Sequence, residues 1–294
     1  MRVGFVCTNY NGSRYTRAAV SSLLDTPRAP DVQVVVVDNR SSEADVESLK
    51  HIASEYPTVE LILNDENVGY FPGLNIGIER LRGSFPDIQH VVVGNNDLVF
   101  PKDLVNRLEE AQDIFETWAV VAPDLVTPDG LHQNPHVAHP ISRFRRLVWD
   151  LYYASYPAAR LIMQAARITS GLTARPERAP DSELFKVPGP IRMGLGACYV
   201  LGPVFFRHFS RLCAPTLLMQ EEFFLAEQLK GIGQVPYYEP RLVVEHCDHG
   251  TMNRIPGREY WQISQRAHRV YKRYLSMSPQ QQDDFIAAAS GTSV

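Results

Sequence analysis

The sequence predicts an α/β fold in which helices flank a mainly parallel central sheet, with a helical insertion further along the chain. Over residues 1–125, short apolar runs alternate with longer amphipathic stretches, and this βαβα order is typical of a parallel sheet covered on both sides. The run Val32–Val37 contains five valines around one Gln, which is the pattern of a central strand buried on both faces.

The strands and helices of the first half follow from these two patterns. The expected strands are Val3–Cys7, Val32–Val37, Val59–Leu63, Val91–Val93 and Ala119–Ala122. The expected helices are Tyr15–Leu24, Glu43–Tyr56 (with Ser41 or Ser42 as N-cap), Pro72–Leu81 and Leu104–Phe115. Polar clusters follow three of the strands, at Thr8–Gly12, Asp38–Ser42 and Asn95–Asp97. Because ligands of such sheets bind beyond the carboxyl ends of the strands, we expect a site there.

The middle of the chain has a different composition. We expect a loop at Leu125–His139. The segment Ile141–Gly171 holds five arginines among aromatic and aliphatic residues, which predicts one or two basic amphipathic helices. Thr173–Asp181 is rich in Pro, Arg and Glu and is typical of a linker.

Regular structure is expected to resume after this linker. Glycines interrupt the apolar segment Ile191–Leu201, and Glu221–Leu229 predicts a helix with an acidic first turn that further glycines end. The remaining expected elements are strands at Val235–Tyr238 and Leu242–Glu245 and a C-terminal helix at Glu259–Leu275. We expect the residues after this helix to be loosely held.

The composition excludes several classes of protein. The chain has 294 residues, of which 45% are hydrophobic and 21% charged, as in ordinary globular proteins. Its formal charge of −4 argues against a strongly basic nucleic-acid binder. The four cysteines form no CxxC pair, which predicts no zinc site and favours reduced thiols in the cytoplasm. The first residues turn polar too early for a signal peptide, and no apolar run is long enough to span a membrane.

Candidate ligand-binding, metal-binding or catalytic residues occur at four places in the sequence. The segment Asn67–Gly77 packs three glycines before a helix, which suits a phosphate or simply a tight turn. Asp97 suits a divalent cation, although an Asp at a strand end is often a cap. His246 can ligate a metal or make a structural hydrogen bond. Glu221 and Glu222 open a helix, where carboxylates serve as caps or as a general base.

Taken in order, these segments resemble the motifs of inverting family 2 type glycosyltransferases with a GT-A fold, especially the bacterial polysaccharide and rhamnosyltransferase branch. Seven motifs carry the resemblance, over residues 3–125 and 190–250. They are the strand end Thr8–Gly12, the "VVDNxS" segment Val36–Ser42, the "NxGxxxGxNxG" loop Asn67–Gly77, the "DxD" strand Val91–Asp97, the pair Gly196-Ala197, the "ED" helix Met219–Leu225 and the "VxH" strand Val243–His246.

The resemblance implies how a nucleotide-sugar donor would be bound. Tyr10 and Asp38 would hold its base, whereas Asn67, Gly69 and Asn75 would line its ribose and diphosphate. The full set of implied donor-binding residues is Thr8, Tyr10, Asp38, Asn67, Gly69, Asn75, Asn95, Asn96, Gly196 and Ala197.

The resemblance also implies the metal ligands and the base. Asp97, with His246 as a second ligand, would bind Mg²⁺ or Mn²⁺. The "DxD" motif reads Asn95-Asn96-Asp97, so the cation would depend more on the substrate phosphates. Glu222 would deprotonate the acceptor hydroxyl, and Glu221 is the alternative base because the "ED" motif reads Glu-Glu. Gln228 stands where the family has an Arg at the end of this helix.

The implied organisation has four regions. They are a nucleotide-sugar-binding half (1–125), a helical insertion that is a lid or a membrane-facing segment (126–190), an acceptor-binding and catalytic half (191–250), and a C-terminal helix and tail (251–294). The implied reaction is metal-assisted transfer of a sugar, with inversion, from a UDP- or dTDP-linked donor to a glycan or lipid-linked acceptor. The basic aromatic segment 141–171 suits contact with the inner face of a membrane, a lid, or a homodimer contact.

Two other functions stand as alternatives. One is a non-catalytic nucleotide-sugar or glycan-binding subunit, in which Asn95 and Gln228 would mark lost activity. The other is a sugar-phosphate nucleotidyltransferase, which would need a glycine-rich loop with Lys or Arg directly after the first strand. The segment Asn11–Arg14 offers one Gly and one Arg there, so this alternative is the weaker one.

Overall fold

The computed structural model describes the chain except residues 138–142, 173–182, 248–256 and 292–294. The strands are β1 (Val3–Asn9), β2 (Val32–Asp38), β3 (Val59–Leu63), β4 (His90–Gly94), β5 (Leu98–Val99), β6 (Val120–Val126), β7 (Gly189–Pro190), β8 (Cys198–Leu201) and β9 (Tyr237–His246). The helices are α1 (Ser13–Leu24), α2 (Glu43–Glu55), α3 (Tyr70–Ser84), α4 (Leu104–Glu110), α5 (Gln112–Thr117), α6 (Arg143–Ala154), α7 (Tyr156–Leu172), α8 (Pro203–His208), α9 (Glu221–Lys230), α10 (Gly257–Leu275) and α11 (Pro279–Ser290).

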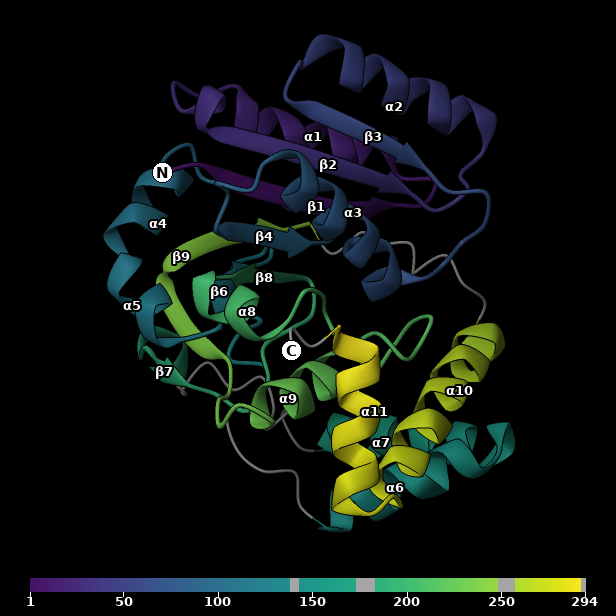
Figure 1. The fold of residues 1–294 in the computed structure, drawn as a ribbon. Coiled ribbons are helices and arrows are strands. Elements are labelled where there is room, and N and C mark those ends of the chain that lie inside the picture. The colour runs from purple at the N-terminus through teal and green to yellow at the C-terminus, as the bar shows by residue number, and fades with distance from the viewer. Residues whose placement is uncertain (138–142, 173–182, 248–256, 292–294) are drawn as a thin grey trace.

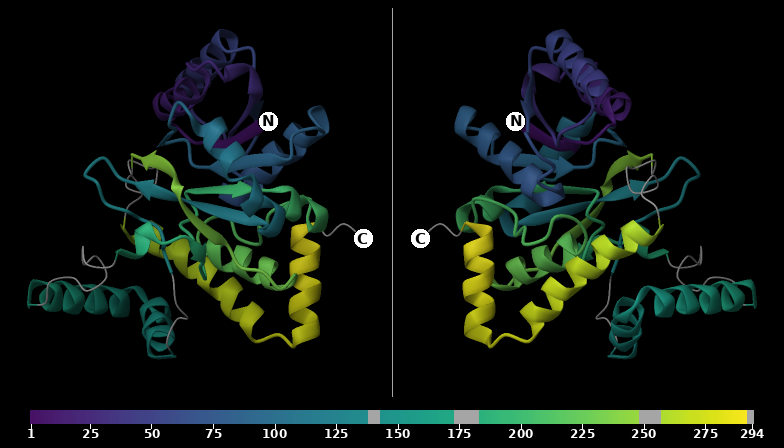
Figure 2. Two further views of the ribbon diagram at one scale, coloured as in Figure 1. Left: turned by 90° about the vertical axis from the view of Figure 1, so that its left-hand side faces the viewer. Right: turned by 90° about the vertical axis from the view of Figure 1, so that its right-hand side faces the viewer.

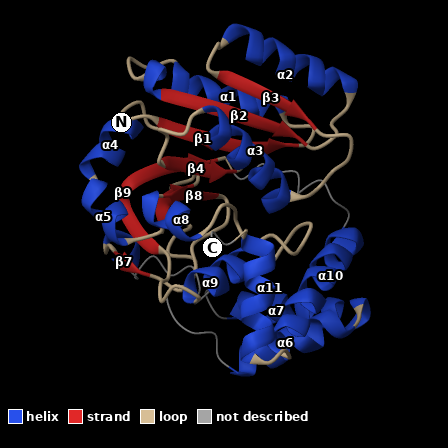
Figure 3. Cartoon of the chain, in the orientation of Figure 1, coloured by secondary structure: helices blue, strands red, loops and turns tan. Residues whose placement is uncertain are grey.

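A mixed sheet runs through the molecule, with helices against both faces (Figure 3). The strand order is β3-β2-β1-β4-β8-β6-β9-β5, and β7 pairs with β9. Strands β3, β2, β1 and β4 are parallel to one another, and β6 is parallel to β9. Strand β8 lies antiparallel between β4 and β6. The predicted α/β fold with a mostly parallel sheet is therefore confirmed.

The valines of β2 show why this sheet needs helices on both sides. Val34 and Val36 belong to one hydrophobic cluster, with residues of α1 and α2, whereas Val35 and Val37 belong to another, with residues of α3. Successive side chains of a strand point to opposite faces, so a run without polar interruption is buried only when both faces are covered.

The C-terminal residues differ from the sequence-based prediction. We expected them to be loosely held, but residues 279–290 form α11, and this prediction is wrong for that segment. The side chain of Ser278 and that of Gln281 form a capping box at its start, and Ile286 is buried in a cluster with Phe224 and Tyr274. The polar, Gln-rich sequence did not predict this helix, because the helix has a buried apolar residue on only one side and so lacks a clear amphipathic pattern.

Two other boundaries also differ from the prediction. The expected helix Leu104–Phe115 is divided at Ala111 into α4 and α5. The expected strands Val235–Tyr238 and Leu242–Glu245 are one long strand, β9, whose register against β6 shifts between Pro123 and Asp124. The basic aromatic segment forms two helices, α6 and α7, as expected. The expected linker Thr173–Asp181 lies outside the described residues.

Helices α6 and α7 stand out from the body beside α10 (Figure 2). Within the part of the chain that the structure describes, no helix combines the length and apolar character needed to cross a bilayer.

The fold brings distant segments to one edge of the sheet (Figure 1). Asn9 at the end of β1 pairs with Asp38 at the end of β2, and Cys7 of β1 pairs with Gly94 of β4. Because β8 is antiparallel to β4, its first residue, Cys198, lies opposite Gly94. His246, at the end of β9, pairs with Leu98. The segments that follow β1, β2 and β4 therefore lie near those that precede β8 and end β9.

Candidate functional site

The ends of β1 and β2 are joined by a buried polar network. The Asn9 amide donates to Asp38 Oδ1 at 2.8 Å, and the Ser41 backbone N–H donates to Asp38 Oδ2 at 2.9 Å. Asp38 is 1% exposed, so its carboxylate shapes the turn after β2. Tyr10, next to Asn9, is 40% exposed and presents the larger surface to a ligand. The half-buried Thr8 lies close to Gly73 of α3, where an added Cβ would come within 2.7 Å of its methyl group.

The loop before α3 requires glycine at position 69. Gly69 has a φ of 99°, and an added Cβ would lie 2.0 Å from the carbonyl oxygen of Leu217. The same carbonyl accepts a hydrogen bond from the Tyr70 backbone N–H at 2.9 Å, and the exposed Asn67 accepts one from Gly69 N–H at 3.0 Å. This close approach fixes the loop against the segment that leads into α9.

Two asparagines that were expected to bind the nucleotide-sugar donor form hydrogen bonds within the protein. Asn75 donates to the carbonyl of Leu212 at 2.9 Å and accepts from its N–H at 2.8 Å, which ties α3 to the segment after α8. The Asn96 amide donates to Asn9 Oδ1 at 3.0 Å and to Thr16 Oγ1 at 2.9 Å. These amides hold the strand ends and loops in place.

Asp97 has a buried carboxylate. The residue is 3% exposed, and neither of its side-chain oxygens has a partner among the described residues. A buried charge without hydrogen bonds is costly unless a counter-charge neutralises it. The side chain of His246 lies beside it, with Nε2 3.5 Å from Asp97 Oδ1.

Gln133 determines which ring nitrogen of a neutral His246 carries the proton. The His246 Nδ1 atom lies 2.6 Å from Oε1 of Gln133, and an amide oxygen can only accept, so Nδ1 carries the proton. In the neutral ring the lone pair of Nε2 then faces Asp97, and the Asn95 amide lies 3.5 Å from the same nitrogen. A lone pair facing an unpartnered carboxylate oxygen fits a cation between them.

This pair supplies only part of a coordination shell. Among the described residues there is no group of three or more His, Cys, Asp or Glu side chains that could hold a metal. Mg²⁺ is bound in many enzymes by one or two protein side chains and completes its shell with substrate phosphates and water. Asp97 and His246 fit such a site, and the remaining positions would come from a phosphorylated ligand.

Glu221 and Glu222 begin α9 but have different surroundings. Glu221 is buried, and its Oε1 accepts from the Met219 N–H at 2.8 Å. Burial, and then the negative charge of Glu222, raise the pKa of Glu221 above its ordinary value. The half-buried Glu222 accepts from the Gly196 N–H through Oε1 at 3.0 Å. Met219 and Gln220, which precede the helix, have positive φ values of 72° and 69°.

The segment Gly196–Ala197 connects this carboxylate pair to the Asp97 side. The Ala197 carbonyl accepts from Asn95 N–H at 2.9 Å, and the Gly196 carbonyl accepts from the Tyr70 hydroxyl at 2.7 Å. Burial raises the pKa of Tyr70 well above its ordinary value, with contributions from the charges of Cys198, Glu221, Glu222 and Asp97. The structure thus gathers Asp97, His246, Glu221 and Glu222 around Tyr70 and Gly196–Ala197.

Sequence reasoning missed two residues of this centre. Gln133 lies in the segment Leu125–His139, for which the sequence predicted a loop and no functional residue. Only the fold brings it to His246. Tyr70 stands inside the glycine-rich motif Asn67–Gly77, and the aromatic hydroxyl between two glycines of that motif was the available signal. Gln228, which stands where the family motif has an Arg, is fully buried. Its amide accepts from Cys213 N–H at 2.8 Å and donates to the Arg211 carbonyl at 2.9 Å.

Comparison with known proteins gives one family and several related folds. The model of the family described as "Glycosyl transferase family 2" matches residues 5–163. The sequence matches none of the curated proteins with which it was compared.

Three solved structures show the same fold at low identity. The chain is 13% identical to GalNAc-T7, solved with UDP, GalNAc and Mn²⁺, with a TM-score of 0.54; the match covers 83% of this chain and 43% of that one. It is 11% identical to residues 1–349 of S. aureus TarS, with a TM-score of 0.51 and 98% and 81% of the two chains covered. It is 16% identical to the mannosyltransferase PcManGT from Pyrobaculum calidifontis, solved with GDP-Man and Mn²⁺, with a TM-score of 0.50 and 98% and 68% covered.

These likenesses concern the fold. The chain spans less than half of the length of GalNAc-T7 but more than two thirds of the TarS and PcManGT chains. The arrangement of the sheet and its flanking helices is therefore the GT-A type expected from the sequence motifs.

Proposed function

The chain belongs to glycosyl transferase family 2, and from this membership we propose that it moves a sugar, with inversion, from a nucleoside-diphosphate donor to a hydroxyl of a glycan or lipid-linked acceptor. The observation that carries the proposal is the arrangement around Gly196–Ala197. The unpartnered carboxylate of Asp97 lies on one side of this segment and Glu222 on the other. A transferase needs these two functions, one for the leaving group and one for the nucleophile, in one cleft.

The Asp97 side suits the leaving group. Two structures with this fold contain Mn²⁺, one with UDP and one with GDP-Man, and we propose that Asp97 and His246 hold Mg²⁺ or Mn²⁺ here. A cation bound there would neutralise charge on the departing nucleoside diphosphate. Gln133 keeps the proton of His246 on Nδ1, so that Nε2 stays available as a ligand.

The Glu222 side suits the attacking hydroxyl. As the acceptor oxygen bonds to the anomeric carbon and the bond from that carbon to the donor phosphate breaks, the hydroxyl proton passes to Glu222. The Gly196 N–H holds Oε1 of Glu222, which directs Oε2 toward this proton. A single displacement of this kind inverts the anomeric carbon.

We assign the base to Glu222 and a structural role to Glu221. Glu221 is buried and already accepts the Met219 N–H. Since the pKa of Glu221 is raised by burial, this residue stays protonated to higher pH and adds no second negative charge beside Glu222.

The donor would extend from Asp97 toward the ends of β1 and β2. We propose that Tyr10 stacks on the nucleotide base, with Asp38 and Thr8 beside it, and that Asn67, Gly69 and Asn95 lie along the ribose and diphosphate. Asn75 and Asn96 contribute by holding α3 and β4 in place, because their amides are bonded within the protein. The motif likeness to the rhamnosyltransferase branch favours a UDP- or dTDP-linked sugar as donor.

Calorimetry and a donor panel test this proposal. UDP, dTDP and GDP would be titrated with and without Mn²⁺, followed by product analysis with UDP- and dTDP-linked sugars. We expect Mn²⁺-dependent binding of UDP or dTDP and turnover of the corresponding sugar. Binding without turnover of any donor would favour the non-catalytic subunit instead. Failure to bind any nucleoside diphosphate would overturn the proposal.

A further inference from the structure

We propose that the exposed faces of α6 and α10 together form a docking surface for an anionic lipid bilayer. Four observations on the described residues carry this inference: an apolar stripe, its fixed orientation, a basic stripe, and the uneven distribution of charge along the chain.

An apolar stripe runs along the outer face of α6. Phe144, Leu147 and Leu151 are 75%, 65% and 57% exposed. Their spacing of three and four residues places them on one side of the helix. Contiguous apolar side chains on a protein surface mark an interaction site, and a helix of this kind can lie in the interfacial region of a bilayer with its apolar side inward.

The opposite face of α6 is fixed to α10. Asp150 accepts from Lys272 at 2.8 Å and lies 3.1 Å from Nε2 of His268. Tyr153 stacks on His268 at 4.4 Å between ring centroids, and the Trp261 indole donates to the Tyr152 carbonyl at 3.1 Å. These contacts turn the apolar stripe away from the body of the protein.

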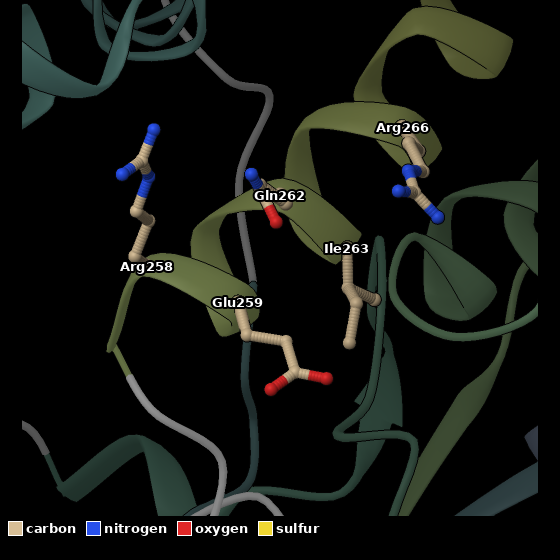
Figure 4. A pocket seen from close by; sticks show the side chains of 5 residues that line it. All are labelled: Arg258, Glu259, Gln262, Ile263 and Arg266. Atoms are coloured by element: carbon tan, nitrogen blue, oxygen red, sulfur yellow. The ribbon is translucent and has the colours of Figure 1, made fainter.

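A basic stripe runs along the exposed side of α10. Arg258, Arg266, Arg269 and Arg273 are all exposed and follow helical spacing, whereas Glu259 is the one acidic residue of this helix. Arg258 and Arg266 border a hollow of about 370 Å³ on the helix surface (Figure 4). Guanidinium groups bind phosphate oxygens in a bidentate manner, so this stripe suits the phosphates of lipid headgroups.

Positive charge is concentrated in α6, α10 and the neighbouring helix α7. The sequences of α6, α7 and α10 contain ten of the chain's 29 Lys and Arg residues but only two of its 33 Asp and Glu residues. The rest of the chain is accordingly acidic. An anionic bilayer attracts such a surface and repels the remainder, which would orient the protein.

This charge favours a bilayer over a second copy of the chain. A two-fold dimer places the same surface of both copies face to face, which would bring the arginine-rich helices together. Like charges in contact destabilise such an interface. A bilayer with anionic headgroups offers both the opposite charge and an apolar interior.

The docking surface is also linked to the catalytic helix. Trp149 of α6 packs edge-on against Phe223 at 5.8 Å between ring centroids, and Phe223 follows Glu222 in α9. A docked α6 would therefore hold the start of α9 near the bilayer, where a lipid-linked acceptor would reside. This last step rests on the proposed function, whereas bilayer binding itself does not.

Vesicle co-sedimentation tests the inference with the full chain. We expect binding to vesicles of phosphatidylcholine mixed with phosphatidylglycerol, weakening with salt, and little binding to phosphatidylcholine alone. The variant Phe144→Ser/Leu147→Ser/Leu151→Ser should bind more than about tenfold more weakly. The variant Arg266→Gln/Arg269→Gln/Arg273→Gln should lose about a hundredfold in affinity.

Matched variants control for apolar content and net charge. Leu63→Ser/Leu184→Ser/Val187→Ser removes three exposed apolar side chains elsewhere, and Lys50→Gln/Lys102→Gln/Lys230→Gln removes three exposed positive charges elsewhere. Both should bind vesicles as the parent chain does, and all four variants should keep nucleotide binding. Absence of binding to the anionic vesicles, or equal losses in test and control variants, would overturn the inference. So would a dimer in solution that the α6 variant converts to a monomer without any change in vesicle binding.

Discussion

The imidazole of His246 donates through Nδ1 to the side-chain oxygen of Gln133 at 2.6 Å, and this contact decides which ring nitrogen faces Asp97. With the proton fixed on Nδ1, Nε2 presents a lone pair 3.5 Å from an Asp97 oxygen that has no hydrogen-bond partner in the described part of the chain. The three side chains come from different segments, the loop after β6, the end of β9 and the turn after β4.

Gln133→Leu should weaken cation binding. Without the acceptor, the proton of His246 can move to Nε2 and block the proposed ligand position. We expect the affinity for Mn²⁺ in the presence of UDP to fall about 10–100-fold, as for other partners of metal-binding histidines. Calorimetry of Mn²⁺ binding measures this directly.

Two variants control for the loss of a glutamine. Gln133→Glu keeps an acceptor for Nδ1 and should retain most of the Mn²⁺ affinity. Gln262→Leu alters an exposed glutamine of α10 and should leave it unchanged. If Gln133→Leu bound Mn²⁺ as tightly as the parent chain does, the positioning role of Gln133 would be wrong.

Asp97→Asn should separate metal binding from folding. The Asp97 carboxylate is buried and has no hydrogen-bond partner among the residues that the structure describes, so replacing it by an amide should leave the unfolding free energy of the metal-free protein unchanged or raise it by about 1–3 kcal/mol. The same variant should lose the stabilisation that Mn²⁺ with UDP gives the parent chain. Thermal unfolding with and without both ligands measures the two effects. A variant destabilised without metal, yet still stabilised by Mn²⁺, would contradict the assignment.

Glu222→Gln and Glu221→Gln should differ in their effect on turnover. Glu222→Gln keeps the shape and the contact with Gly196 N–H but removes the proton acceptor, so kcat should fall about 10²–10⁴-fold with nucleotide affinity unchanged. Glu221→Gln resembles the protonated carboxyl that burial favours and should keep most of the activity. Steady-state rates and calorimetry on both variants make the comparison. The reverse ranking would assign the base to Glu221.

The pH dependence of stability should report on Glu221. Because burial raises its pKa in the folded state, the folded chain binds more protons than the unfolded chain between the ordinary carboxyl value and the raised one. The contribution of Glu221 is therefore fully present below the ordinary value and is lost as pH rises through the raised one. Urea unfolding from mildly acidic to mildly basic pH should show this loss, and Glu221→Gln should make it smaller. An equal pH dependence in both proteins would exclude Glu221 as its source.

The sequence predicted the sheet better than it predicted the site. The valine run Val32–Val37 and the alternation around it are local signals, and β1 to β4 appear where they were expected. The pairing of β8 between β4 and β6 depends on how distant segments meet, and no local pattern records it. Gln133 was missed for the same reason, since only the fold brings its loop to His246. Asn75 and Asn96 were expected to bind the donor, and their amides bond to neighbouring protein groups, because glycine- and asparagine-rich turns need such bonds to be stable.

Gly69→Ala should uncouple the loop before α3 from the start of α9, which carries the proposed base Glu222. Gly69 has a positive φ, and an added Cβ would lie 2.0 Å from the Leu217 carbonyl, which also accepts the Tyr70 N–H. Gly130→Ala is the matched control, because Gly130 also has a positive φ, of 81°, but an added Cβ there meets nothing within 4 Å. Backbone strain alone costs about 1–3 kcal/mol, so Gly130→Ala should lose about that much unfolding free energy and keep its activity. Gly69→Ala should lose more, and its kcat should fall as well, because displacing Leu217 also displaces Met219 and the start of α9. Urea unfolding and steady-state rates measure both quantities. Equal stability losses and equal activities in the two variants would mean that the contact between Gly69 and Leu217 does not position Glu222.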